Sequence, residues 1–97
     1  MDRLIRQAID KKLLLEFSYD RSKRVVEPHV YGLKDGKRQL LTYQIRGYSA
    51  SGNLPDWRRF DLDGITGLAV LNEHFPGPRD FSGWRDSSFD QILAVVR

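Results

Sequence analysis

The stretch RVVEPHVYGLKDGKRQLLTYQIRGYS, residues 24–49, has the pattern of two β-strands joined by a tight turn. Apolar and polar residues alternate on both sides of an Asp-Gly pair at 35–36, and this pair tolerates the positive φ angles of a two-residue hairpin turn. On the first strand, Val26, Pro28 and Val30 fall on one face. Because Pro28 cannot donate a hydrogen bond to a neighbouring strand, we expect an edge or a bulge there.

The sequence on both sides of this hairpin predicts further elements. Before it, residues 2–12 have apolar residues at helical spacing, and residues 13–19 alternate with a period of two. After it, residues 57–63 and 65–75 predict two more strands with a turn between them. Five short strands with tight turns favour a small antiparallel β-barrel, which removes exposed sheet edges by closing on itself.

The C-terminal residues predict a second helix. Ser88 is a suitable N-cap for it, and the apolar residues that follow lie at i, i+3, i+4 and i+7: Phe89, Ile92, Leu93 and Val96. We therefore expect a mainly β domain with an N-terminal helix over residues 1–75. Residues 76–97 would form a loop and a short helix that packs on this domain or on a partner subunit.

Length and composition limit the class of protein. The 97 residues suffice for one small domain, and 40% hydrophobic with 30% charged residues is the balance of an ordinary globular protein. The chain has no cysteine, which excludes disulfides and thiolate metal sites, and it has no apolar run of membrane-spanning length. We expect a cytoplasmic protein with no cofactor, no metal and no membrane partner.

The net charge of +3 is unevenly distributed along the chain. Residues 1–59 carry 13 Lys/Arg and 7 Asp/Glu, whereas residues 60–97 carry 3 and 6. This asymmetry indicates a basic face and slightly favours an anionic partner. A solvated charged surface, common in any soluble protein, explains the same counts.

Groups suited to catalysis are few. His29 and His74 are the only histidines, and neither belongs to a metal-ligand spacing. Asp61 and Asp63 are two residues apart beside a turn, where capping and solvation explain them better than paired catalysis. We therefore expect no enzyme activity; only His29 and Asp61 side by side in an open pocket would favour a hydrolase.

Two adjacent arginines interrupt the predicted strand at 57–63. Arg58 shares a face with Phe60 and Leu62, which predicts that its guanidinium points toward the core. A charge there needs either an internal carboxylate or a groove that an external anion enters, and both alternatives remain open. Arg59 lies on the other face, where we expect a solvated side chain.

Aromatic and cationic side chains alternate across the predicted strands: Tyr31, Tyr43, Arg46, Tyr48 and Trp57. This mixture is typical of proteins that bind single-stranded nucleic acid, since bases stack on the rings while cations hold the backbone. The alternative is that tyrosines simply fill half-buried strand positions. For Tyr43, which is flanked by apolar residues on its face, we favour a core position.

A series of short motifs over residues 3–75 resembles the WYL domain of bacterial regulators. The series begins with LIRQAIDKK and a strand ending in FSY, and continues with R-x-V-E-P at 24–28. A glycine turn, LLTY at 40–43 and R-x-F-x-L-D-x-I at 58–65 follow. The chain looks most like the short stand-alone members, in which EPH and YQ…G-x-S-x-SG also recur.

The resemblance implies an Sm-like barrel, related to the Src-homology-3 barrel, with a ligand-sensing role. Other members are coupled to a DNA-binding helix-turn-helix or serve in phage defence, and their ligands are thought to be nucleic-acid fragments or nucleotides. The family's strand arginine falls on Arg58, and the arginine that enters its second strand falls on Arg24. The naming tripeptide falls on Arg38, Gln39 and Leu40, where only the leucine is kept.

These observations predict a non-catalytic module that binds single-stranded nucleic acid or a nucleotide in a bacterial regulatory or phage-defence system. The expected contacts are Arg24, Tyr31, Arg38, Gln39, Arg46, Trp57 and Arg58. A separate DNA-binding or effector protein is a further expected partner. The alternative is a structural protein that forms a homodimer through barrel edges or the C-terminal helix, with no nucleic-acid ligand.

Overall fold

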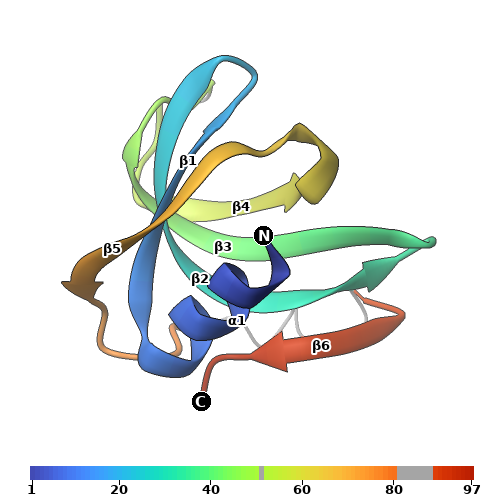
Figure 1. The fold of residues 1–97 in the computed structure, drawn as a ribbon. Helices are drawn as coiled ribbons and strands as arrows, with labels where there is room; N and C mark the ends of the chain where they lie inside the picture. Colours follow the sequence, from blue (N-terminus) through green and yellow to red (C-terminus); the bar gives the residue numbers. More distant parts are fainter. Residues whose placement is uncertain (51, 81–88) are drawn as a thin grey trace.

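The computed structural model describes residues 1–50, 52–80 and 89–97, and within them it is mainly β, with six antiparallel strands and one N-terminal helix (Figure 1). The elements follow the chain as α1 (Asp2–Lys11), β1 (Leu13–Tyr19), β2 (Ser22–Lys34), β3 (Lys37–Gly47), β4 (Asp56–Asp61), a 3-10 turn η1 (Leu62–Gly64), β5 (Thr66–His74) and β6 (Gln91–Val95). The strand order is β4-β3-β2-β1-β5, and β6 pairs with β2. No helix in this part of the chain is long and apolar enough to cross a membrane.

The predicted hairpin and N-terminal helix are both confirmed. Lys34 pairs with Lys37, and the turn residues Asp35 and Gly36 have φ angles of 52° and 78°. These positive values match a two-residue turn that twists in the same sense as its strands. Helix α1 buries one apolar stripe and ends at Lys12, which adopts a left-handed conformation.

Strand β2 has an extra residue at His29, so Pro28 marks a bulge as predicted. Pro28 pairs with Thr42 and Val30 pairs with Leu41, which leaves His29 without a partner position on β3. The bulge reverses the side-chain alternation, and the expectation that Val26 and Val30 share a face is wrong. Val26 lies in the main core, whereas Val30 lies in a second cluster.

A second bulge occurs in β3 at Ile45. Val25 pairs with Arg46 and Val26 pairs with Gln44, so the extra residue is now on β3. If Ile45 were paired in a regular ladder, Arg46 would share the buried face of Gln44. Because of the bulge, Arg46 is exposed and forms an ion pair with Glu73 of β5, with 3.0 Å between Nη2 and Oε1.

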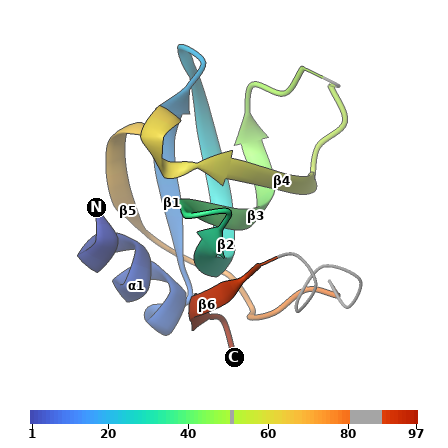
Figure 2. The same ribbon diagram turned by 90° about the vertical axis from the view of Figure 1, so that its right-hand side faces the viewer.

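Apolar side chains gather in two clusters on opposite sides of the sheet. The main core contains the buried side chains of α1 together with Leu15, Phe17, Leu40 and Phe60, among others. The second cluster consists of Val30, Leu41 and Phe89, with Trp57 and Val95 packed against it. Figure 2 shows α1 and β6 at one end of the molecule, with the β1–β2 turn and the β3–β4 loop at the opposite end.

The expected C-terminal helix is wrong, because the chain forms strand β6 there. Strand β1 pairs with β2 only as far as Val26, which leaves the same edge of β2 open from Val30 onward. Strand β6 fills this edge, and its apolar residues divide between the two clusters. The backbone hydrogen bonds that β6 gains along this open edge therefore stabilise a strand more than the helical spacing of four apolar residues stabilises a helix. Ser88, the expected cap, lies outside the described residues.

Candidate functional site

A pocket of about 430 Å³ lies between the β1–β2 turn and the β3–β4 loop. Arginines, carboxylates and aromatic rings from distant parts of the sequence meet in it. The residues that line it are Tyr19, Asp20, Arg24, Ala50, Asn53, Asp56, Arg58, Arg59 and Phe60. Its size is within the range of small-molecule sites, and it presents both hydrogen-bond donors and acceptors.

The side chain of Arg24 is buried at the pocket, with 7% of the residue exposed. Its guanidinium carbon lies 5.4–5.8 Å from the ring centroids of Tyr19, Tyr48 and Phe60, a distance at which cation–π attraction operates. Nη2 donates a hydrogen bond of 3.2 Å to the carbonyl of Tyr19. Nε is buried and has no hydrogen-bond partner among residues 1–50, 52–80 and 89–97. No carboxylate neutralises this cation through an ion pair within those residues.

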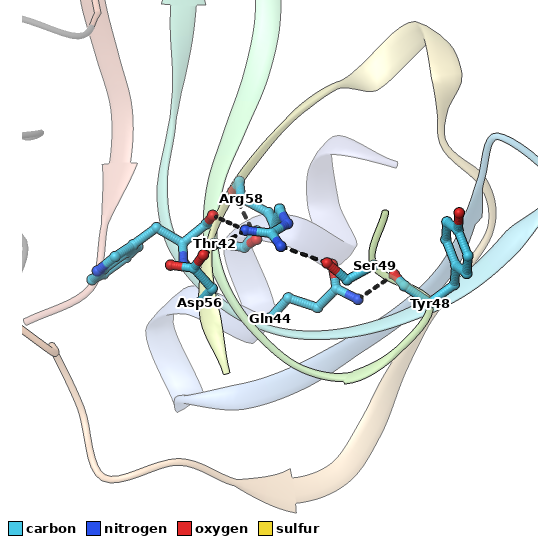
Figure 3. A network of polar contacts seen from close by, with 7 residues as sticks. Thr42, Gln44, Tyr48, Ser49, Asp56 and Arg58 are labelled. Atoms are coloured by element: carbon cyan, nitrogen blue, oxygen red, sulfur yellow. Dashed lines mark hydrogen bonds and ion pairs between the residues drawn. The ribbon is translucent and has the colours of Figure 1, made fainter. Parts of the chain in front are cut away.

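Arg58 is held by a local network (Figure 3). Nη1 donates to the Asp56 carboxylate and to the Trp57 carbonyl, both at 2.9 Å, and Nη2 donates to the Ser49 hydroxyl. The hydrogen bond from Arg58 holds the pKa of Asp56 below its usual range. Arg58 therefore has a carboxylate partner in its own chain and also lines the pocket, while the binding of an external anion stays a prediction.

The loop that carries Tyr48 over Arg24 is fixed at its base. Gly47 has a φ of 95°, and a Cβ there would collide with the carbonyl of Lys23. The amide of Tyr48 donates to that carbonyl at 2.9 Å. The buried Gln44 then donates from Nε2 to the carbonyl of Arg46. It also donates to the carbonyl of Tyr48 (Figure 3). Tyr48 does not line the pocket, but the residue is 54% exposed and its ring lies beside Arg24, so a ligand can reach it.

Of the seven predicted contact residues, the structure brings Arg24 and Arg58 together in the pocket. Tyr31 is buried in the core, because it follows the His29 bulge and points inward. Its hydroxyl donates a 2.7 Å hydrogen bond to Asp2, and burial raises the pKa of the phenol. Arg46 is exposed beside Glu73, as described above.

The other three predicted contacts also lie outside the pocket lining. Gln39 donates to Asp61 at 2.8 Å and accepts from Arg59 Nε at 2.6 Å. Trp57 packs edge-on against His29 and Tyr43, so Tyr43 is half-buried beside the second cluster instead of in the main core. Arg38 is exposed on β3.

Several residues that line the pocket were not predicted from the sequence. Tyr19 and Asp20 end β1 and start its turn, and Asn53 and Asp56 lie in or beside an irregular loop. Strand periodicity places residues on faces but does not place loops, so these four could not be assigned to the site. Arg59 was expected to be solvated; instead it is half-buried, with its guanidinium 4.0 Å from the ring centroid of Phe89.

A second polar cluster, which we call the clasp, joins β2 to the chain after β5 through Glu27, His29 and Arg79. The carboxylate of Glu27 is 3% exposed and accepts two hydrogen bonds of 2.8 Å from Arg79. His29 Nε2 accepts from the Arg79 amide at 3.1 Å, so Nδ1 carries the proton and donates to the Glu27 carbonyl at 2.9 Å. Burial lowers the pKa of His29.

None of the clasp residues lines the pocket in the described part of the chain. His29 is buried between the rings of Trp57 and Phe75 and does not line the pocket. It is therefore not placed beside Asp61 in an open site, the arrangement that would favour a hydrolase. Residues 1–50, 52–80 and 89–97 also contain no group of three or more side chains suited to holding a metal ion.

Comparisons with models of protein families, with curated proteins and with solved structures found no match to this chain. The resemblance to the WYL domain therefore stays a prediction from the sequence.

Proposed function

We propose that this chain is a non-catalytic module that binds a nucleotide or a short single-stranded nucleic acid in the pocket. The observation that carries the proposal is Arg24, a buried cation without an ion-pair partner among the described residues and with a donor, Nε, that no acceptor satisfies. Burying a guanidinium in this state is costly, and an anionic ligand would recover part of the cost. Arg58, on the same face of the sheet, would supply a second cation.

The surroundings of Arg24 favour a ligand that combines an anion with an aromatic ring. Tyr48 offers an exposed ring face, on which a base can stack. Asp20, Asp56 and Asn53 offer acceptors beside the arginines, which suits the amino and imino groups of a base. A groove that only follows a phosphate backbone would not need carboxylates, because they repel it.

We further propose that the first five strands form the Sm-like barrel of a WYL domain. The sheet order β4-β3-β2-β1-β5 supports it, as does the 3-10 turn that leads directly from β4 to β5. In that arrangement the chain would sense a ligand on behalf of a separate DNA-binding or effector protein. Regulation of transcription and phage defence are the two settings that the resemblance suggests.

The test is a titration of labelled single-stranded oligonucleotides and a panel of nucleoside monophosphates at low and moderate salt. We expect saturable binding that weakens with salt, because each phosphate contact releases counterions. Arg24→Met should weaken binding about tenfold or more, since hydrogen bonds to charged groups contribute about 1.5–3 kcal/mol. Arg46→Ala is the matched control, because it removes an exposed arginine that does not line the pocket. Equal affinities of these two variants, or no binding of any probe at low salt, would overturn the proposal.

A further inference from the structure

The C-terminal strand is anchored by an aromatic residue in a shaped site, which we call the Phe89 seat. Phe89 is 7% exposed and packs on Val30 and Leu41, while the guanidinium of Arg59 covers its ring. Gly32 completes the seat by having no side chain. A Cβ built on Gly32 would lie 2.7 Å from Cδ1 of Phe89 and 2.5 Å from the carbonyl oxygen of Gln91. The seat therefore fits an aromatic ring that precedes an extended backbone.

Backbone pairing extends this site along β2. Leu33 pairs with Gln91 and Val30 pairs with Val95, in an antiparallel register. Two further hydrogen bonds close the ends, from Asp90 N to Leu33 O at 2.8 Å and from Val96 N to His29 O at 2.9 Å. Strand addition of this kind takes its affinity from the backbone and its specificity from a few side-chain pockets.

Strand β6 depends on few elements of its own chain. Its main packing partners are β2 and α1, and Arg6 of α1 donates to the Leu93 carbonyl at 3.1 Å. In sequence it is separated from β5 by the connection from residue 75 to residue 90. The clasp holds this connection at Arg79 through contacts with β2 that do not involve β6.

We propose that β6 is exchanged between two copies of this chain, so that Phe89–Val96 of each copy occupies the Phe89 seat and the β2 edge of the other. The occupant is a second copy because the sequence that fits the seat in one chain is present in every other copy. Exchange forms the same side-chain and backbone contacts as the closed monomer, so the protein concentration decides the balance between them. The sequence offered a homodimer through the C-terminal helix as an alternative. In the proposed exchange, the interface of that homodimer is strand β6 in place of the helix.

Single-cysteine variants test the exchange, since the chain has no cysteine of its own. Leu33→Cys in one chain and Gln91→Cys in another would face each other only when β6 crosses between copies, because these two residues are register partners. The two proteins are mixed, concentrated and oxidised, and the covalent heterodimer is measured on a non-reducing gel. Ser18→Cys mixed with Lys23→Cys is the matched control, because this pair lies in register between β1 and β2, which do not exchange.

We expect several-fold more covalent heterodimer from the Leu33/Gln91 mixture than from the control. Diluting the mixture before oxidation should bring the yield down to that of the control, because the closed monomer is favoured at low protein concentration. A yield no higher than the control in the concentrated mixture, or an excess over the control that does not disappear on dilution, overturns the exchange.

Discussion

Arg24 and Arg79 both lie against aromatic rings, yet within the described residues only Arg79 has a carboxylate partner. Arg79 donates two hydrogen bonds of 2.8 Å to the buried carboxylate of Glu27, and its guanidinium carbon is 5.0 Å from the ring centroid of Tyr43. Arg24 is surrounded by three rings and donates one hydrogen bond to a neutral carbonyl, while its Nε stays unsatisfied.

The difference separates a structural arginine from a candidate binding arginine. Two charges that satisfy each other inside a protein leave little for a ligand to gain. A buried cation that is stabilised only by rings and one carbonyl retains the capacity to bind an anion. Substitutions at the clasp should therefore reduce stability, whereas substitutions at the pocket should reduce affinity.

The largest effect is expected for Arg79→Ala. This change leaves the buried Glu27 carboxylate without its bidentate partner. Because the Arg79 side chain is 41% exposed, the free energy of unfolding should fall by about 2 kcal/mol, less than for a fully buried pair. Denaturant unfolding measures the loss. Arg46→Ala, which removes an exposed ion pair with Glu73, is the control and should change the stability by less than about 1 kcal/mol. Equal losses for the two variants would show that the clasp is not a structural pair.

A smaller effect is expected from acid, through His29. Its pKa is lowered in the folded state by burial, so the unfolded chain binds a proton more readily. Stability should therefore be unaffected by His29 well above its ordinary pKa and should fall as the pH drops from that value toward the lowered one. Unfolding curves at several pH values measure this, with His29→Gln as the variant that should lose the dependence. The carboxylate of Glu27 partly offsets the imidazolium charge, which is why the loss should be smaller than for Arg79→Ala.

Tyr31→Phe tests whether a residue with a binding-type side chain has a structural role instead. The hydroxyl of Tyr31 donates to Asp2 from a buried ring, so its removal should lower the free energy of unfolding by about 1 kcal/mol or less. The affinity for nucleotide probes should not change. If Tyr31→Phe reduced the affinity and left the stability unchanged, Tyr31 would be a binding residue and not a structural one.

The smallest effect on stability is expected at the pocket itself. Arg24→Met keeps much of the side-chain volume and removes the unsatisfied Nε, so the free energy of unfolding should stay within about 1 kcal/mol of the original value. Thermal or denaturant unfolding, carried out without ligand, is the measurement. A loss comparable to that of Arg79→Ala would mean that Arg24 is a structural residue, and would break the distinction between the two arginines.

Much of the fold was accessible from the sequence, because strand periodicity and turn residues act locally. The Asp35-Gly36 turn, helix α1 and the inward direction of Arg58 all follow from patterns of a few residues. The bulges at His29 and Ile45 are different, since each reverses the alternation of the residues after it. Pro28 indicates an edge or a bulge without showing that an extra residue follows, and no residue beside Ile45 signals the second bulge. They explain why Tyr31 and Arg46 were assigned to a site that they do not line.

The C-terminal strand could not be predicted for a related reason. Its apolar spacing fits a helix, and only the open edge of β2, more than fifty residues earlier in the chain, makes a strand more favourable. The same holds for Arg24, whose surroundings depend on Tyr19, Tyr48 and Phe60 from three other segments. Such contacts depend on how the elements pack together, which a pattern within one element does not record.

The two bulges of the β2–β3 hairpin compensate for each other, because each strand contributes one extra residue. One inserted residue lies in β2 and the other in β3, so the pairs on both sides of them, Arg24 with Gly47 and Val30 with Leu41, keep the register that the turn sets. Only the pairs that Val26, Glu27 and Pro28 form with β3 are shifted by one residue from that register. Deleting both extra residues would leave every pair and every face as it is, because Val26 and Val30 already lie on opposite faces. The bulges therefore keep the register at both ends of the hairpin and alter only which residues of β2 and β3 reach each face.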